Sequence, residues 1–145
     1  MRVFIAGVMQ GSSHATDVHC QEYRGRIEAA VRRALPDASI YDPWANHRES
    51  LTYDDLTGKQ VFLEHNQMCG EVDAVVAFLP QASMGTAIEM WEAFRNHRKV
   101  ISISPMAHNW AIKFISDHRF ESLDELDQAA DDGTLAQLLT APPTH

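Results

Sequence analysis

Residues 72–79 have the sequence VDAVVAFL, a nearly continuous apolar run that decides the fold class of this chain. A strand with so few polar residues must be covered on both faces, which is typical of the centre of a parallel sheet. Residues 3–8 (VFIAGV) and 100–103 (VISI) are runs of the same kind. Because helical patterns lie between these runs, the sequence predicts an α/β fold with a doubly wound parallel sheet.

The clearest helical pattern covers residues 21–35, where apolar side chains recur at helical spacing until Pro36 ends the pattern. The other predicted elements are a strand at 39–41 and helices at 60–70, 86–96, 122–130 and 135–139. The sequence thus predicts one domain of about five strands over residues 1–140, followed by a frayed tail at 141–145.

Composition narrows the classes of function. Of the 145 residues, 45% are hydrophobic and 22% are charged, and no apolar run is long enough to cross a bilayer. The N-terminal stretch lacks the pattern of a secretory signal, and two cysteines without a CxxC spacing favour reduced thiols, so we expect a cytoplasmic protein without a membrane partner. With a net charge of −8 and scattered basic residues, a polymeric nucleic acid partner is disfavoured.

Two loops rich in small residues follow predicted strands, at residues 7–13 and 80–86. Ligands of open parallel sheets bind at the carboxyl ends of the strands, so both loops are candidate parts of a site. The first loop has neither the spacing of a P-loop nor a GxGxxG turn, which removes the main support for a triphosphate or NAD site. We therefore expect no cofactor.

The second loop leads into a helix, with Ser83, Gly85 and Thr86 at its start and Glu89 about one turn further on. Free N–H groups and a partial positive charge at a helix start can hold an anion such as a phosphate. The same dipole is expected to keep Glu89 ionised, as a carboxylate nucleophile requires. In the alternative interpretation, Ser83 or Thr86 only caps the helix and Glu89 is an ordinary acidic residue.

Three segments, residues 3–11, 72–77 and 83–93, together resemble the nucleoside 2-deoxyribosyltransferase superfamily. The spacing from Ser83 to Glu89, S-x-G-x-x-x-E, is particularly similar to that of its nucleoside 5′-monophosphate N-glycosidases. This resemblance implies a flavodoxin-like fold and a homodimer or higher oligomer. It also implies that Glu89 attacks the sugar and that Ser83 binds the phosphate, beside Gly85 and Thr86.

The resemblance extends to the first strand and its loop. It implies that Gly7, Gln10, Gly11 and Ser12 form another wall of the nucleotide pocket. The deoxynucleotide hydrolases that the chain resembles carry a tyrosine at the place of Phe4, near the sugar. The missing hydroxyl group predicts that ribose is tolerated, whereas the alternative is that Phe4 is a core residue of a buried strand.

The proton donor departs from the family pattern. Family members carry an acid, usually an aspartate, on the helix before the central strand, and counting back from Asp73 leads to His65. We predict the neighbouring Glu64 as the donor, because a shift of one residue is common at such positions. Asp54 and Asp55 are the alternatives.

Eight histidines raise the question of a metal site, but the sequence has no HExxH or CxxC motif, so no metal is expected. The leading hypothesis is hydrolysis of the N-glycosidic bond of a nucleoside 5′-monophosphate through a glycosyl-Glu89 intermediate. One alternative is a transferase that exchanges nucleobases, and another is a non-catalytic nucleotide sensor. In each case the expected partner is a small nucleoside or nucleotide.

Overall fold

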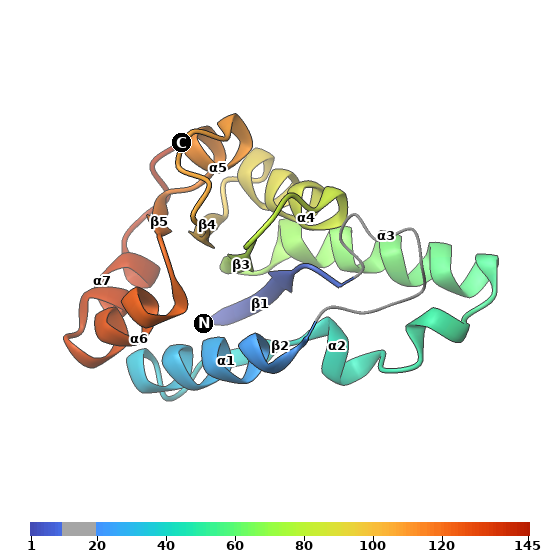
Figure 1. The fold of residues 1–145 in the computed structure, drawn as a ribbon, viewed down its shortest axis with the longest axis horizontal. Coiled ribbons are helices and arrows are strands. Elements are labelled where there is room, and N and C mark those ends of the chain that lie inside the picture. The colour runs from blue at the N-terminus through green and yellow to red at the C-terminus, as the bar shows by residue number, and fades with distance from the viewer. Residues whose placement is uncertain (10–19) are drawn as a thin grey trace.

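Parallel strands form a sheet at the centre of the molecule, with helices on both faces (Figure 1). A computed structural model describes residues 1–9 and 20–145; the predicted pocket residues Gln10, Gly11 and Ser12 lie outside the described residues. Within the described chain the sheet has five strands in the order β2-β1-β3-β4-β5. The strands are β1 (Arg2–Gly7), β2 (Ser39–Tyr41), β3 (Ala74–Phe78), β4 (Lys99–Ile103) and β5 (His118–Phe120). This is the flavodoxin-like order, which confirms the predicted fold class.

The helices divide between the two faces of the sheet. On one face lie α1 (Glu22–Ala34), α6 (Leu123–Asp131) and α7 (Thr134–Thr140), and on the other lie α3 (Asp55–Glu71), α4 (Met84–Arg95) and α5 (Trp110–Ile115). A short helix α2 (Pro43–Asn46) and a 3-10 turn η1 (Ser50–Thr52) precede α3. None of the described helices is long and apolar enough to span a membrane.

Strand β1 shows how the two cores arise from a single run of apolar residues. Its side chains alternate between faces, so Val3 and Ile5 pack against α1, α6 and α7, whereas Phe4 and Ala6 pack against α3, α4 and α5. All four side chains are fully buried. The unbroken apolar pattern that marked the strand is therefore explained by burial on both sides.

Four described elements were not predicted from the sequence pattern: α2 and η1 before α3, and α5 and β5 further along the chain. Strand β5 has three residues at the edge of the sheet, two of them charged or polar, and this is too short for a hydrophobic period. Helix α5 has six residues and begins at the N-cap Asn109, whose Oδ1 accepts from the N–H of Ala111 at 3.0 Å.

Residues 141–145, which we expected to fray, pack against the base of β4 and β5. The Asp117 carboxylate accepts from the hydroxyl group of Thr144 at 2.9 Å, and the Lys99 ammonium donates to the Pro142 carbonyl at 2.7 Å. The ring of His145 stacks on Phe94 with centroids 4.2 Å apart. These contacts place the tail on the protein surface rather than free in solvent.

Candidate active site

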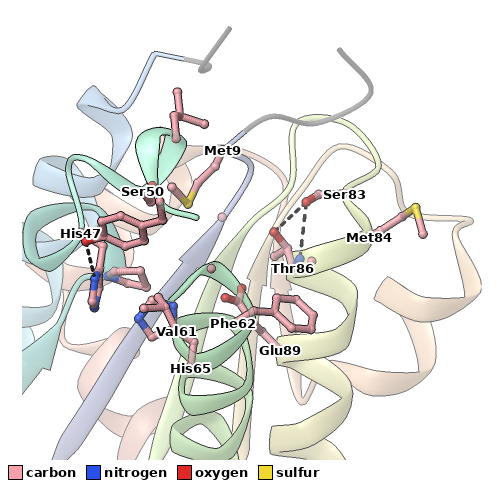
Figure 2. A pocket seen from close by; sticks show the side chains of 16 residues that line it. Met9, His47, Ser50, Val61, Phe62, His65, Ser83, Met84, Thr86 and Glu89 are labelled. Carbon is pink, nitrogen blue, oxygen red and sulfur yellow. Dashed lines mark hydrogen bonds between the residues drawn. The ribbon is translucent and has the colours of Figure 1, made fainter. Parts of the chain in front are cut away.

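A cavity of about 520 Å³ opens at the carboxyl ends of β1 and β3 (Figure 2). Strand order reverses between these two strands, since β2 lies to one side of β1 and β4 and β5 lie beyond β3. Ligands of doubly wound sheets bind at such a reversal. The walls come from the end of β1, the segment 43–58, helix α3 and the start of α4.

Glu89 lies in this cavity, as the sixth residue of α4. Burial raises the pKa of its carboxyl group to about 8, although the positive charge of Arg24 acts in the opposite direction. No described residue donates a hydrogen bond that would offset this loss of hydration. The expectation that the helix start keeps Glu89 ionised was therefore wrong, because the helix dipole acts mainly within the first turn and burial outweighs it.

The start of α4 forms one end of the cavity. Ser83 is the N-cap, and its Oγ accepts from the N–H of Thr86 at 3.4 Å and from the Thr86 hydroxyl group at 3.0 Å. Ser83 thus caps the helix, as the alternative interpretation had it, but its own hydroxyl proton is left to be donated elsewhere. A Cβ at Gly85 would meet nothing within 4 Å, so the backbone here is open to a ligand.

Gly7 ends β1 and also lines the cavity. A Cβ at this position would lie 2.7 Å from Cε2 of Tyr23, inside van der Waals contact. The Tyr23 hydroxyl group donates to the Val8 carbonyl at 3.2 Å and so fixes the ring against the strand end. Glycine is required here because helix α1 packs so closely on the loop.

Arg24 of α1 forms hydrogen bonds to the same end of β1, and its side chain is almost fully buried. Its guanidinium group donates to the Gly7 carbonyl at 3.3 Å and to the Asp42 carboxylate at 2.9 Å. These bonds connect the ends of β1 and β2. No sequence signal pointed to this role, since Arg24 occurs in an ordinary helical pattern.

Imidazole and phenol rings line the other end of the cavity. His65 Nε2 lies 3.2 Å from the Tyr41 hydroxyl group, and His47 Nδ1 lies 3.1 Å from the Tyr53 hydroxyl group. The two imidazole rings meet edge to face, with centroids 5.1 Å apart. Burial lowers the pKa of His65 to about 4, and His47 acts in the same direction, so His65 is uncharged at neutral pH.

The predicted acids of α3 do not enter the cavity. Glu64 is exposed and accepts from the side chain of Gln60 at 2.7 Å. Asp54 is the N-cap of α3, where it accepts from the N–H of Thr57, and Asp55 is exposed beside it. The neighbouring His65 faces the cavity instead, because one residue along a helix turns a side chain by about 100°.

Phe4 lies behind the cavity and is fully buried. Its ring stacks on Tyr41 at 5.6 Å and lies 6.0 Å from the His65 ring. It is not among the residues that line the cavity. This position agrees with the alternative that Phe4 is a core residue.

The rest of the described cavity wall includes residues from the segment before α3 and from α3 itself. His47, Ser50 and Tyr53 line the cavity from the first, and Val61, Phe62 and His65 line it from the second. No sequence signal singled out Val61 or Phe62, although Val61 and His65 are four residues apart and share a helical face, whereas counting back from Asp73 reached His65 before Glu64 was preferred. Within residues 1–9 and 20–145, no three His, Cys, Asp or Glu side chains are grouped to hold a metal ion.

No family model matches the chain, and no curated protein matches its sequence. Solved structures do match. A 2-deoxyribosyltransferase from the psychrotolerant bacterium Bacillus psychrosaccharolyticus aligns with a TM-score of 0.62 at 16% identity, over 88% of this chain and 90% of its own. The chain shares its fold. The CMP N-glycosidase BcmB of Clostridium botulinum aligns with a TM-score of 0.53 at 17% identity, over 90% of this chain and 99% of its own. A conserved protein from Enterococcus faecalis V583 aligns with a TM-score of 0.57 at 16% identity, over 90% of this chain and 97% of its own.

The fold that the chain shares with these structures agrees with the flavodoxin-like architecture that the resemblance implied. Of the predicted site residues within the described chain, this fold brings Gly7, Ser83, Gly85, Thr86 and Glu89 to one cavity. The predicted donor and the predicted sugar contact lie outside it. The arrangement offers a carboxyl group between a helix N-terminus and a group of imidazole and phenol rings.

Proposed function

We propose that this protein hydrolyses the N-glycosidic bond of a nucleoside 5′-monophosphate, releasing the base and the sugar 5-phosphate. Glu89 is the nucleophile that forms a glycosyl ester with C1′ of the sugar. The fold shared with a 2-deoxyribosyltransferase and a CMP N-glycosidase supports an enzyme that acts on nucleosides or nucleotides.

The observation that carries the proposal is the order of groups along the cavity. In Figure 2, Glu89 lies between Ser83 and Thr86 on one side and His65 and His47 on the other. A nucleoside monophosphate has the same order, with phosphate, sugar and base in sequence. The helix N-terminus suits the phosphate, the carboxylate lies where the sugar is held, and the rings suit the base.

The chemistry then follows the two steps of a retaining glycosidase. The Glu89 carboxylate attacks C1′ as the bond to the base breaks, and water later hydrolyses the ester. Because burial raises the pKa of Glu89 to about 8, the nucleophilic form is the minority at neutral pH. We expect kcat/KM to rise with pH up to about 8, as this group ionises.

A transferase that passes the sugar to a second nucleobase is the alternative, and the deoxyribosyltransferase neighbour favours it. The free hydroxyl proton of Ser83 favours a phosphorylated substrate and hence hydrolysis. A non-catalytic sensor is the weaker hypothesis, because a carboxyl group in the cavity would oppose an anionic ligand without contributing to binding.

The assay that tests the proposal measures base release by chromatography. The protein is incubated with the common nucleosides and their 5′-monophosphates, each with and without an added free base. Hydrolysis of monophosphates that does not depend on the free base supports the proposal. Exchange of bases without net hydrolysis supports the transferase, and binding without turnover supports the sensor.

The assembly is also a proposal. Helices α3 and α4 expose large apolar side chains, and these are Phe62, Leu63, Ile88 and Trp91, each at least 40% exposed. A surface of this kind suits a homodimer, which we propose and which sedimentation at several concentrations would test. A cytoplasmic location stays a prediction.

A further inference from the structure

The base end of the cavity contains the rings of His47, Tyr53 and His65 but no carboxyl group from the described residues. Glu89 is the one acidic side chain among the described residues that line the cavity. A departing nucleobase carries the electron pair of the broken bond, so something at this end must stabilise that charge. The described side chains offer hydrogen bonds for this purpose.

The hydrogen bond between Tyr41 and His65 determines which hydrogen bond His65 can offer. A phenol is a stronger donor than a neutral imidazole, and an imidazole nitrogen is a stronger acceptor than a phenol oxygen. We therefore assign the 3.2 Å contact as a donation from the Tyr41 hydroxyl group to His65 Nε2. This assignment places the proton of the neutral ring on Nδ1, where no described residue accepts it.

The surroundings keep this ring uncharged. The titratable and charged groups that act on it are His47 from the segment before α3, Tyr41 from β2, Arg24 from α1, and Glu64 on its own helix. Burial lowers its pKa to about 4, with His47 and Arg24 acting in the same direction and Glu64 acting against them. At neutral pH the ring can donate a hydrogen bond but is not an imidazolium acid.

We propose, on the basis of the glycosidase function above, that His65 donates a hydrogen bond to the departing nucleobase and that the base leaves as an anion. The Glu89 oxygen bonds to C1′ while the electron pair of the C1′–N bond moves to the base. The base anion then takes a proton from water, and the resulting hydroxide hydrolyses the ester and restores the carboxylate. Tyr41 is a positioning residue, because it fixes the tautomer of His65 without contacting the base.

This role predicts a preference within the nucleotide class. Nucleotides whose base is stable as an anion, or departs without charge, should be cleaved fastest. Guanosine and 7-methylguanosine 5′-monophosphates form one test pair, since the methylated base departs as a neutral molecule. Uridine and 5-fluorouridine 5′-monophosphates form a second pair of nearly equal shape, in which fluorine stabilises the anion.

The experiment measures kcat/KM on both pairs for the wild type, His65→Ala, His65→Asn and Tyr41→Phe. Gln67→Ala is the control, since Gln67 is exposed on the same helix and bonds to Glu71. For His65→Ala we expect a loss of about 10- to 100-fold on the parent nucleotides, the usual effect of a lost hydrogen bond to a charged group, and a clearly smaller loss on 7-methylguanosine and 5-fluorouridine monophosphates. His65→Asn retains an N–H donor and should recover most of the activity, and Tyr41→Phe should fall between the two.

Several outcomes would overturn the proposal. Equal losses on parent and analogue would show that His65 shapes the pocket without stabilising the leaving base. A decline of wild-type kcat/KM on the alkaline side that disappears in His65→Asn would show that an imidazolium acid delivers the proton. If the wild type releases no base from any of the four nucleotides, the proposed function itself fails and this inference with it. If the wild type does cleave them but His65→Ala leaves the ratio of kcat/KM between parent and analogue unchanged, this inference alone is refuted.

Discussion

Ser83 has two functions in this account, since one oxygen caps α4 and one proton faces the substrate. The cap contacts are visible in the structure, whereas the phosphate contact is part of the proposal. The two functions can be separated. Losing a helix cap lowers the stability of the protein and affects all substrates alike, whereas losing a phosphate contact changes the preference between phosphorylated and unphosphorylated substrates.

Ser83→Ala should lower kcat/KM for the 5′-monophosphate about 10- to 100-fold more than for the corresponding nucleoside, because a hydrogen bond to a charged group is lost. Ser122→Ala is the matched control, since Ser122 caps α6 by accepting from the N–H of Glu125 at 3.3 Å, remote from the cavity. Both variants should lose about 1 kcal/mol of stability. Equal losses on nucleotide and nucleoside would show that Ser83 serves as a cap alone.

The residues that the sequence could identify were those tied to a local signal. Ser83, Gly85, Thr86 and Glu89 follow a strand and begin a helix, so their joint position followed from the chain itself. Which residue of α3 faces the cavity depended on the rotation of α3 about its axis, which a single residue changes by about 100°. The amphipathic pattern of α3 is too weak to determine that rotation. Glu64 was therefore predicted from the sequence, whereas the structure shows that the neighbouring His65 faces the cavity.

At the scale of elements, the contact between the end of β1 and α1 determines the shape of the pocket wall. Four of the five described strands and the longer helices were predictable, because their apolar residues recur with a single strand or helix period that ends at a glycine, proline or polar residue. Strand β5 and helix α5 were not, since three and six residues are held in place by their neighbours more than by their own pattern.

Gly7→Ala should destabilise the protein by about 1–3 kcal/mol, because its Cβ would overlap the Tyr23 ring. Gly25→Ala on α1 is the control, since a Cβ there meets nothing within 4 Å and alanine favours a helix. Urea unfolding measures both. If Gly7→Ala unfolds at the wild-type urea concentration, the close packing of α1 on this loop is contradicted.

At the scale of the whole molecule, the buried carboxyl group of Glu89 connects function to stability. Its pKa in the folded protein is raised from 4.5 to about 8. A carboxyl group of this kind contributes stability that is fully present below the unfolded pKa and is lost as pH rises through 8. The active site therefore lowers the stability of the fold at the pH where it functions.

Glu89→Gln removes this titration, so the free energy of unfolding of the variant relative to wild type should increase between pH 5 and pH 8, by up to about 1.4 kcal/mol per pH unit. Urea unfolding at pH 5, 7 and 8.5 measures the difference, and comparison with wild type cancels the contributions of other groups. Glu64→Gln, which changes an exposed carboxyl group, is the control. A stability difference that stays constant from pH 5 to 8.5 would mean that Glu89 ionises normally in the fold.

The central claim is that Glu89 attacks the sugar, and the most direct measurement is the rate of base release from the preferred nucleoside 5′-monophosphate by Glu89→Ala. We predict a fall of at least about a thousandfold relative to wild type, because the covalent step has no other carboxylate to carry it among the described residues that line the cavity. The variant should still bind the nucleotide, which shows that the pocket is intact. Base release by a folded Glu89→Ala protein within about tenfold of the wild-type rate would contradict the proposed mechanism.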